Sequence, residues 1–474
     1  MASTNPARGM RDFLPADVRK RNYVINIIKE VYESYGFEPL ETPSVENIET
    51  LLGKYGEEGN QLVFKILKRG EKLDLANATK ESDLSDLALR YDLTVPLARV
   101  VANNKNDLPK FFKRYQIQPV WRADRPARGR FREFYQCDVD AIGSVSTIVE
   151  ADMMAAVCEI LLKLRLNDDE ANFDDFVVLA NHRDILFGTL DAFEIPEIKR
   201  SQVLVIMDKG DKIGWPNVIR ELTSIGLTTL QASEFIKAVF FGSTFVAESP
   251  DSRPRREIQR EQNESNLAKL EELIGSSHAG QRGIKTIREF LRISTGTPSD
   301  GHIRFHPSLA RGLSYYTGAI FEIGLNRNDF AGSIGGGGRY DGLIGMFGKE
   351  QIPACGFSLG LERILVVMEE RGMFPPEIAE STAADVMVTI WNEDTISDSL
   401  KLAAELRKQG IRVTIYPEAD KLGKQFKYAD SIGIPFVTVL GDEEAKAGRV
   451  KLKNMSTGEE WMLKPAEIGS KVLK

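Results

Sequence analysis

VWRADRPARGRFREFYQCDVD, residues 120–140, is the stretch from which the fold is predicted. It begins and ends in strand-like sequence, and Pro126 and Gly129 between the two ends are typical of a loop. The segment therefore predicts two strands joined by a loop. Because side chains alternate along a strand, three polar residues of the second strand share one face, namely Gln136, Asp138 and Asp140.

The region around this segment is strongly basic in a chain that is acidic overall. Between Lys110 and Tyr135 there are eight basic residues and two acidic ones, whereas the whole chain has a formal net charge of −7. An acidic chain is unsuited to coating nucleic acid without specificity. A local basic surface is still enough to bind nucleic acid at one place.

The composition is that of a globular protein, and 474 residues predict about three domains at roughly 150 residues each. Three scattered cysteines offer no disulfide framework, and four scattered histidines predict no metal cluster. The longest apolar run is far shorter than the ~18 residues of a membrane span. The N-terminus has no apolar signal-peptide core. We therefore expect a reduced, cytoplasmic chain without a membrane anchor.

Element patterns organise the first 300 residues. They predict a helix near 17–35, extended sequence over 36–46, strands within 61–100, a helix near 149–165, and a polar, helical region over about 184–300.

The rest of the chain returns to strand patterns. Strands begin again near Ile303, a helix starts near Leu359, and residues 371–385 are typical of a linker. The last ~90 residues alternate strand and helix as βαβαβ, which predicts a parallel or mixed sheet covered by helices.

Three arginines stand at the ends of apolar segments: Arg122, Arg311 and Arg363. Each one alone is as well explained by a surface ion pair, which is common and contributes little. Together they suit a polyphosphate site, because a guanidinium group binds phosphate oxygens in pairs and stays charged.

A glycine run, SIGGGGRYDG, covers residues 333–342. It lacks the GK[ST] ending of a phosphate-binding P-loop, and no helix opens directly on it, as a dinucleotide-binding fingerprint requires. Taken alone, the run favours a β-bulge or a tight hairpin.

Other polar residues predict either a solvated sheet face or a buried pocket. In LRYDLTVP, residues 89–96, Asp92 and Thr94 are two apart and are expected on one face of a strand. Tyr315 and Tyr316 lie in a glycine-flanked segment. If these faces are buried, carboxylates and an amide suit an ammonium group or imidazole N–H groups.

These segments together resemble a class II aminoacyl-tRNA synthetase, specifically the histidyl-tRNA synthetase family. GFEPLETPSVE with Pro43, the quoted segment 120–140 and GFSLGLERIL resemble the three motifs of the class, in the same order. LARGLSYYTG and GGGGRYDGL are peculiar to the histidyl family. The resemblance covers nearly the whole chain.

The resemblance implies two sets of ligand contacts. For ATP, Arg122 and Arg311 would approach the α-phosphate, Arg363 the γ-phosphate, Arg130 would clamp the bent triphosphate and Phe134 would stack on adenine. For histidine, Asp92, Thr94 and Gln136 would receive the α-amino group and backbone, Asp140 and Tyr316 the imidazole nitrogens, and Tyr315 would complete the pocket floor. Arg311 and Arg122 would be the catalytic residues.

The resemblance also implies the partners and the domains. ATP would bring Mg²⁺ as a substrate complex, with no protein-held metal and no tightly bound prosthetic group, and tRNA(His) would contact Arg128 and Arg132. Asp124 departs from the Glu common in the second motif. The chain would be a homodimer with an α+β core, an antiparallel sheet flanked by helices. The core would cover residues 1–183 and 303–372, a helical insertion domain 184–302, and an α/β anticodon-binding domain 385–474, where Lys421, Lys424 and Lys427 are candidates to face RNA.

Two alternatives remain beside ATP-dependent ligation of L-histidine to tRNA. A synthetase-like regulatory protein would sense histidine or uncharged tRNA, but such relatives usually lose the C-terminal domain or the motif arginines, which this chain keeps. A small-molecule ligase without tRNA would need neither the C-terminal domain nor the basic loop.

Overall fold

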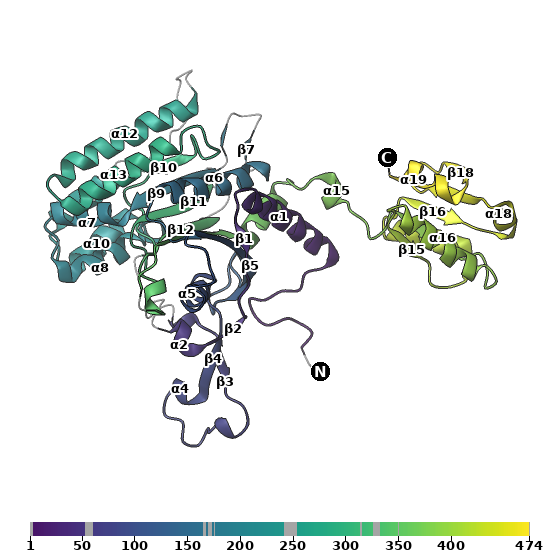
Figure 1. The fold of residues 1–474 in the computed structure, drawn as a ribbon, viewed down its shortest axis with the longest axis horizontal. Helices are drawn as coiled ribbons and strands as arrows, with labels where there is room; N and C mark the ends of the chain where they lie inside the picture. Colours follow the sequence, from purple (N-terminus) through teal and green to yellow (C-terminus); the bar gives the residue numbers. More distant parts are fainter. Residues whose placement is uncertain are drawn as a thin grey trace. The chain divides into compact units, whose positions relative to one another are not determined.

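The computed structural model describes residues 3–52, 60–164, 167–168, 173–174, 176–240, 254–312, 315–325, 332–348 and 350–473. The chain divides into two compact units, Met1–Phe374 and Pro375–Lys474 (Figure 1). The division falls inside the linker predicted over residues 371–385. None of the described helices is long and apolar enough to cross a membrane.

The first unit is built on an eight-stranded sheet in the order β1-β5-β6-β13-β12-β11-β9-β10. The pairs β1–β5 and β9–β10 are parallel and the other neighbours are antiparallel, so the predicted antiparallel sheet is correct except at its two edges. The strands are β1 (Glu38–Pro39), β5 (Phe112–Trp121), β6 (Glu133–Ile142), β9 (Phe176–His182), β10 (Ile303–Phe305), β11 (Ala319–Leu325), β12 (Gly335–Arg339) and β13 (Ala354–Gly360).

The two strands and loop predicted from residues 120–140 are β5, β6 and the residues between them. The strands pair antiparallel from Phe112 opposite Ile142 to Trp121 opposite Glu133. Gln136, Asp138 and Asp140 share one face of β6, as the alternation predicted. All three side chains are buried, so this face is not the solvated face that remained an alternative.

Helices α1 (Pro15–Ser34), α6 (Ile148–Lys163) and α14 (Leu361–Glu370) contact one another or the sheet beside β6. The start of α1 is set by Pro15 at its first position and by Asp17, whose carboxylate accepts the Leu14 N–H at 3.1 Å. Val24, Ile28 and Val31 form its buried stripe. Most side chains of α6 are apolar and buried, as expected for a helix packed between the sheet and other helices.

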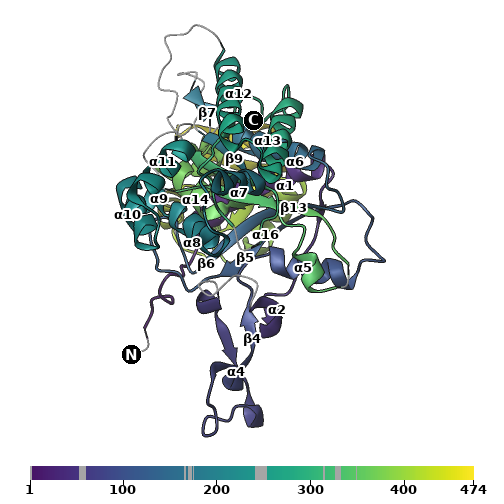
Figure 2. The same ribbon diagram turned by 90° about the vertical axis from the view of Figure 1, so that its left-hand side faces the viewer.

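The strands predicted within residues 61–100 are correct only in part. A separate three-stranded sheet has the order β2-β4-β3 and, with short helices, forms an arm on this unit (Figures 1 and 2). Its elements are β2 (Val45–Asn47), α2 (Ile48–Leu51), β3 (Lys65–Leu67), η1 (Gly70–Lys72), α4 (Glu81–Leu84) and β4 (Ser85–Leu89).

Asp92 and Thr94 do not lie on a strand, so that part of the prediction is wrong. The helix α5 (Thr94–Asn103) begins here, and the Asp92 carboxylate accepts the Val95 N–H at 3.1 Å. Such a hydrogen bond satisfies a backbone donor that the first turn of a helix leaves unpaired. The β-branched residues Thr94 and Val95 made a helix start resemble a strand.

The helices of residues 184–302 lie together at the β9–β10 end of the sheet (Figure 1). One hydrophobic cluster joins them to Leu309 and Ile320, and another joins them to Phe305. This packing anchors the helical region to the sheet. The helices are α7 (Arg183–Ala192), α8 (Glu197–Met207), α9 (Gly210–Ile213), α10 (Trp215–Ser224), α11 (Thr229–Phe240), α12 (Arg255–Ile274) and α13 (His278–Ile293).

The second unit has a five-stranded sheet in the order β15-β14-β16-β17-β18. Its first three strands are parallel and its last two pairings are antiparallel, which confirms the predicted βαβαβ pattern as a mixed sheet. The elements are β14 (Val386–Val388), α16 (Ile396–Lys408), β15 (Val413–Ile415), α17 (Leu422–Ser431), β16 (Phe436–Val439), α18 (Asp442–Ala447), β17 (Val450–Asn454) and β18 (Glu460–Leu463).

The glycine run forms β12, a central strand of the large sheet, and not the bulge or hairpin that it suggested alone. It pairs with β11 on one side and β13 on the other. A Cβ atom added at Gly337 would overlap the carbonyl oxygen of Gly356 and the backbone of Phe357. Absence of a side chain therefore allows β12 and its neighbour to approach closely.

Gly337→Ala should lower the stability of the first unit, because the added methyl group meets backbone that cannot move alone. Overpacking of this kind typically costs about 1–3 kcal/mol. Thermal unfolding followed by circular dichroism should show a midpoint several degrees lower. Gly336→Ala is the matched control, since the nearest atom to its added Cβ is Phe321 O at 3.6 Å. Equal midpoints for the two variants would contradict the explanation.

Candidate active site

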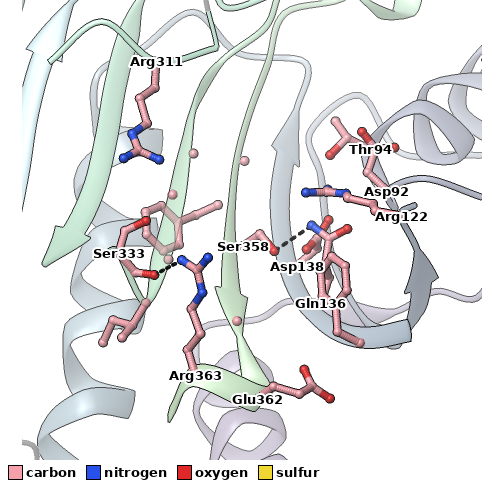
Figure 3. A pocket seen from close by; sticks show the side chains of 18 of the residues that line it. Asp92, Thr94, Arg122, Gln136, Asp138, Arg311, Ser333, Ser358, Glu362 and Arg363 are labelled. Carbon is pink, nitrogen blue, oxygen red and sulfur yellow. Dashed lines mark hydrogen bonds between the residues drawn. The ribbon is translucent and has the colours of Figure 1, made fainter. Parts of the chain in front are cut away.

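One cavity of about 330 Å³ brings together most of the residues that the sequence predicted for a site. Its lining residues come from β6, β12, β13, the start of α14, the segments that follow β4 and β5, and the segment before β11. Figure 3 shows ten of these side chains with their labels. The predicted residues that line it are Asp92, Thr94, Arg122, Arg130, Phe134, Gln136, Asp140, Arg311, Tyr315, Tyr316 and Arg363.

Arg122 follows directly on β5 and is held by its surroundings. Its Nε donates to the carbonyl oxygen of Tyr91 at 2.9 Å. The guanidinium carbon lies 4.3 Å from the centre of the Tyr91 ring and 5.2 Å from that of the Phe134 ring. These contacts fix the direction of the guanidinium group while other N–H donors remain available to a ligand.

Positive charge gathers at one end of the cavity. The guanidinium group of Arg363 donates to the carbonyl oxygen of Ser333, and Arg311 forms an ion pair with Glu322 of β11. Burial lowers the pKa of Arg363, and the nearby charges of Arg130 and Arg311 lower it further. Arginines placed so close to one another indicate a site for an anion with several charges.

Negative charge gathers at the other end. Asp140 is buried, accepts a hydrogen bond from the Tyr340 hydroxyl, and pairs with Arg114 at 2.8 Å. A side chain at Gly356 would overlap the Asp140 carboxylate. The position of Asp140 is therefore fixed from three sides.

Asp138 lies next to Asp140 on the same face of β6 and also lines the cavity. Burial raises the pKa of Asp138 to about 7, while Arg114 opposes the shift and Asp140 adds to it. Gln136, on the other side, donates from Nε2 to the hydroxyl of Ser358 at 3.0 Å (Figure 3).

Tyr315 and Tyr316 pack on each other with ring centres 4.5 Å apart. The backbone N–H of Tyr316 donates to Gly312 O at 2.9 Å, and Gly312 has a φ of +63°. A side chain at Gly312 would overlap the Tyr316 ring. This turn therefore requires glycine. Leu313 and Ser314, within the same segment, lie outside the described residues.

Arg128 and Arg132 do not line this cavity. Arg128 is exposed on the loop between β5 and β6, and its Nε donates to Glu370 at 3.0 Å. The Nε of Arg132 donates to Asp124 O at 3.1 Å, and its backbone N–H donates to Gly9 O at 2.8 Å. The loop is thus tied both to α14 and to the N-terminal segment.

Sequence reasoning assigned no ligand contact to several polar residues that line the cavity, among them Asp138, Ser358, Tyr340 and Glu362. Alternation placed Asp138 on the strand face of Gln136 and Asp140, but neither the pattern nor the resemblance gave it a ligand. Tyr340 belongs to the GGGGRYDGL segment. Ser358 and Glu362 both lie in the GFSLGLERIL segment, but only the pairing of β13 with β6 brings Ser358 opposite Asp138.

In the described parts of the chain, no cluster of three or more His, Cys, Asp or Glu residues could hold a metal ion. The cavity can receive a ligand that is highly anionic at one end and cationic or N–H-rich at the other. Arg122 follows strand β5 in the second class motif, and Arg363 lies in helix α14 in the third. These arginines on a mostly antiparallel sheet define the architecture of a class II aminoacyl-tRNA synthetase.

Comparison with known proteins narrows this class. The family model for histidyl-tRNA synthetase matches residues 9–364, and that for the anticodon binding domain matches residues 385–474. The chain belongs to the histidyl-tRNA synthetase family.

Individual relatives agree along nearly the full length. A histidine–tRNA ligase of Christiangramia forsetii is 40% identical over 463 residues, which cover 96% of this chain and 95% of the relative. That of Porphyromonas gingivalis is 40% identical over 472 residues, 98% of this chain and 97% of the relative. The crystal structure of histidyl-tRNA synthetase from Nostoc sp. superposes with a TM-score of 0.78 at 30% identity, covering 100% of this chain and 99% of that one.

Asp138→Asn should stabilise the protein at alkaline pH. An Asp in an unfolded chain ionises near pH 4, whereas Asp138 of the folded protein keeps its proton up to about pH 7. The folded state binds the extra proton within that window, so the contribution of Asp138 to stability falls as pH rises through it. The variant should melt a few degrees above the unsubstituted protein at pH 8, and the difference should shrink toward pH 5.

Asp152→Asn is the control for this measurement, because Asp152 is partly exposed in an ion pair with Lys113. Its effect should not grow from pH 5 to pH 8. A difference for Asp138→Asn that is the same at both pH values would show that the Asp138 pKa is not raised.

Proposed function

We propose that this protein is a histidine–tRNA ligase that activates L-histidine with ATP and transfers it to the 3′ end of tRNA(His). The observation that carries the proposal is one cavity lined by arginines and by buried carboxylates and tyrosines, with Arg311 and Arg363 on the side away from Asp92 and Asp138 (Figure 3). Histidyl-adenylate formation needs both ends at once. A purely regulatory role is not favoured, since Arg122, Arg311 and Arg363 all line the cavity.

The arginine end suits the nucleotide. Arg122 would bind the α-phosphate, Arg363 the γ-phosphate and Arg130 the bent triphosphate, and Phe134 would stack on adenine. Arg311 would approach the α-phosphate after leaving or sharing its pairing with Glu322. Mg²⁺ would arrive as part of the ATP substrate, partly hydrated on the phosphates.

Activation is an in-line attack of the histidine carboxylate on the α-phosphorus, with pyrophosphate leaving. A carboxylate is already a nucleophile, so no general base is required. Two guanidinium groups at the α-phosphate would stabilise the charge that builds on its non-bridging oxygens. Positioning of the two substrates supplies much of the remaining acceleration.

The carboxylate end suits histidine. Asp92, Thr94 and Gln136 would receive the α-amino group and backbone, and Asp140 and Tyr316 the imidazole nitrogens, above the floor formed by Tyr315. The hydroxyl of Tyr340 contacts Asp140 and would keep that carboxylate in place. Buried polar groups reject amino acids that leave them unpaired by large factors.

Transfer would follow when the 3′-hydroxyl of the terminal adenosine of tRNA attacks the adenylate carbonyl. We assign the catalytic core to residues 1–183 and 303–372, an insertion domain to 184–302 and the anticodon-binding domain to 385–474. Arg128 and Arg132 would contact the acceptor stem. The first motif around Pro43 would form the interface of a homodimer.

The first test is ATP–pyrophosphate exchange without tRNA, carried out with each of the twenty amino acids. Histidine alone should support exchange, and Arg311→Ala should lower the rate by about 10²–10³, the loss typical of one transition-state donor. Arg220→Ala, far from the cavity residues in sequence and on α10, is the matched control. Exchange with another amino acid, or none with any, would refute the proposal.

The tRNA contact is tested separately. Arg128→Ala should raise the KM for tRNA several-fold and reduce the slope of log affinity against log salt by about 1, because one phosphate contact is lost. Arg220→Ala again serves as the control. An unchanged slope would mean that Arg128 serves only its ion pair with Glu370.

A further inference from the structure

Ser358 of β13 lies next to two cavity residues of the neighbouring strand β6, Gln136 and Asp138. It lies on β13 directly opposite Asp138 of β6. Its hydroxyl oxygen accepts a hydrogen bond from Gln136 Nε2 at 3.0 Å. Ser358 also acts on Asp138, because it favours the charged form of that carboxylate and so opposes the rise in the Asp138 pKa. A hydroxyl has one hydrogen, so after accepting from Gln136 the Ser358 hydroxyl still has that hydrogen to donate toward the facing residue, Asp138.

This arrangement determines which atoms face the ligand. Because Nε2 of Gln136 is used on Ser358, Oε1 is the free end of the amide. Both Gln136 Oε1 and Asp138 Oδ1 are buried acceptors without a hydrogen-bond partner in the described structure. Asp138 is 2% exposed and Gln136 is 9% exposed. Buried acceptors that remain unpaired are costly, and a ligand that supplies donors would remove the cost.

The charge around these acceptors selects the donor. Arg114 pairs with Asp140 at 2.8 Å, whereas Asp138 forms no ion pair within the described part of the chain. An excess of negative charge favours a cation over a neutral N–H group. A primary ammonium group carries one positive charge and three N–H donors, so it can satisfy several acceptors at once.

We propose that Asp138 is a further amino-acid-binding residue and that Ser358 is the positioning residue that turns Asp138 and Gln136 toward the α-ammonium group of histidine. The proposal rests on the proposed function and adds two residues to its amino-acid site. Asp92 then shares the ammonium group with Asp138, while Asp140 and Tyr316 remain with the ring. Histidine binding thereby brings N–H donors and a positive charge to the buried side chain of Asp138, whose Oδ1 has no hydrogen-bond partner in the described structure.

The test compares histidine with 3-(imidazol-4-yl)propionate, which keeps the ring and the carboxylate but lacks the amino group. Binding of each to the full chain is measured by calorimetry. Asp138→Asn should weaken histidine about 10- to 100-fold, the range for loss of a hydrogen bond to a charged group. It should change the affinity for the analogue less than twofold, and the KM for ATP should not move.

Ser358→Ala should also weaken histidine binding, but less than Asp138→Asn does. We expect a several-fold rise in the KM for histidine with kcat little changed. Ser358→Thr, which keeps the hydroxyl group, should restore the affinity. Asp152→Asn and Ser34→Ala are the matched controls outside the cavity. Ser34 donates its hydroxyl hydrogen to Val31 O within α1.

Two results would overturn the proposal. Equal losses for histidine and the analogue in Asp138→Asn would mean that Asp138 serves the ring or the pocket as a whole. Unchanged histidine affinity would mean that Asp138 does not touch the substrate. Failure of the proposed function is seen separately, because the unsubstituted protein would then show no histidine-dependent exchange.

Discussion

The site depends on a central strand that has almost no side chains. Gly335 to Gly338 of β12 lie between β11 and β13, and three of these glycines line the cavity. Any side chain at Gly337 would overlap the neighbouring backbone, and one at Gly335 would meet the Phe357 ring and the Ser358 carbonyl oxygen. Because β12 lacks side chains here, space for the cavity remains over the central strands while the strand pairing is kept. Residues of β6 and β13 line the same cavity.

Charge is separated along this cavity at a cost to stability. Burial and the neighbouring arginines lower the pKa of Arg363, and burial raises the pKa of Asp138. Each shift means that the free protein holds charges in an unfavourable setting. An anionic triphosphate would stabilise the charged arginines, and an ammonium group would stabilise the charged carboxylate. The unfavourable electrostatics of the free protein therefore favour substrates that carry both groups.

Much of this could be predicted from the sequence, and the failures have physical causes. Alternation along residues 133–140 gave the buried face of β6, and the order of the motifs gave the class of the fold. Asp92 and Thr94 were expected on a strand, because β-branched residues near a helix start carry strand character. Ser358 could not be predicted, since its importance arises from the register of β13 against β6, which joins residues more than two hundred positions apart.

A buried polar layer connects the cavity with the segment around Pro43. Arg114 contacts Asp140 and also donates to Gln116 Oε1 at 3.2 Å, and Gln116 Nε2 donates to Thr42 Oγ1 at 2.9 Å. The fully buried Arg90 completes the layer by donating to Thr42 O at 2.6 Å. Buried networks of this kind specify one arrangement because a broken member leaves its partners unpaired. The carboxylate that we assign to the imidazole ring is therefore held by the same interactions that fix the first motif. A change in either one must be accommodated by the other.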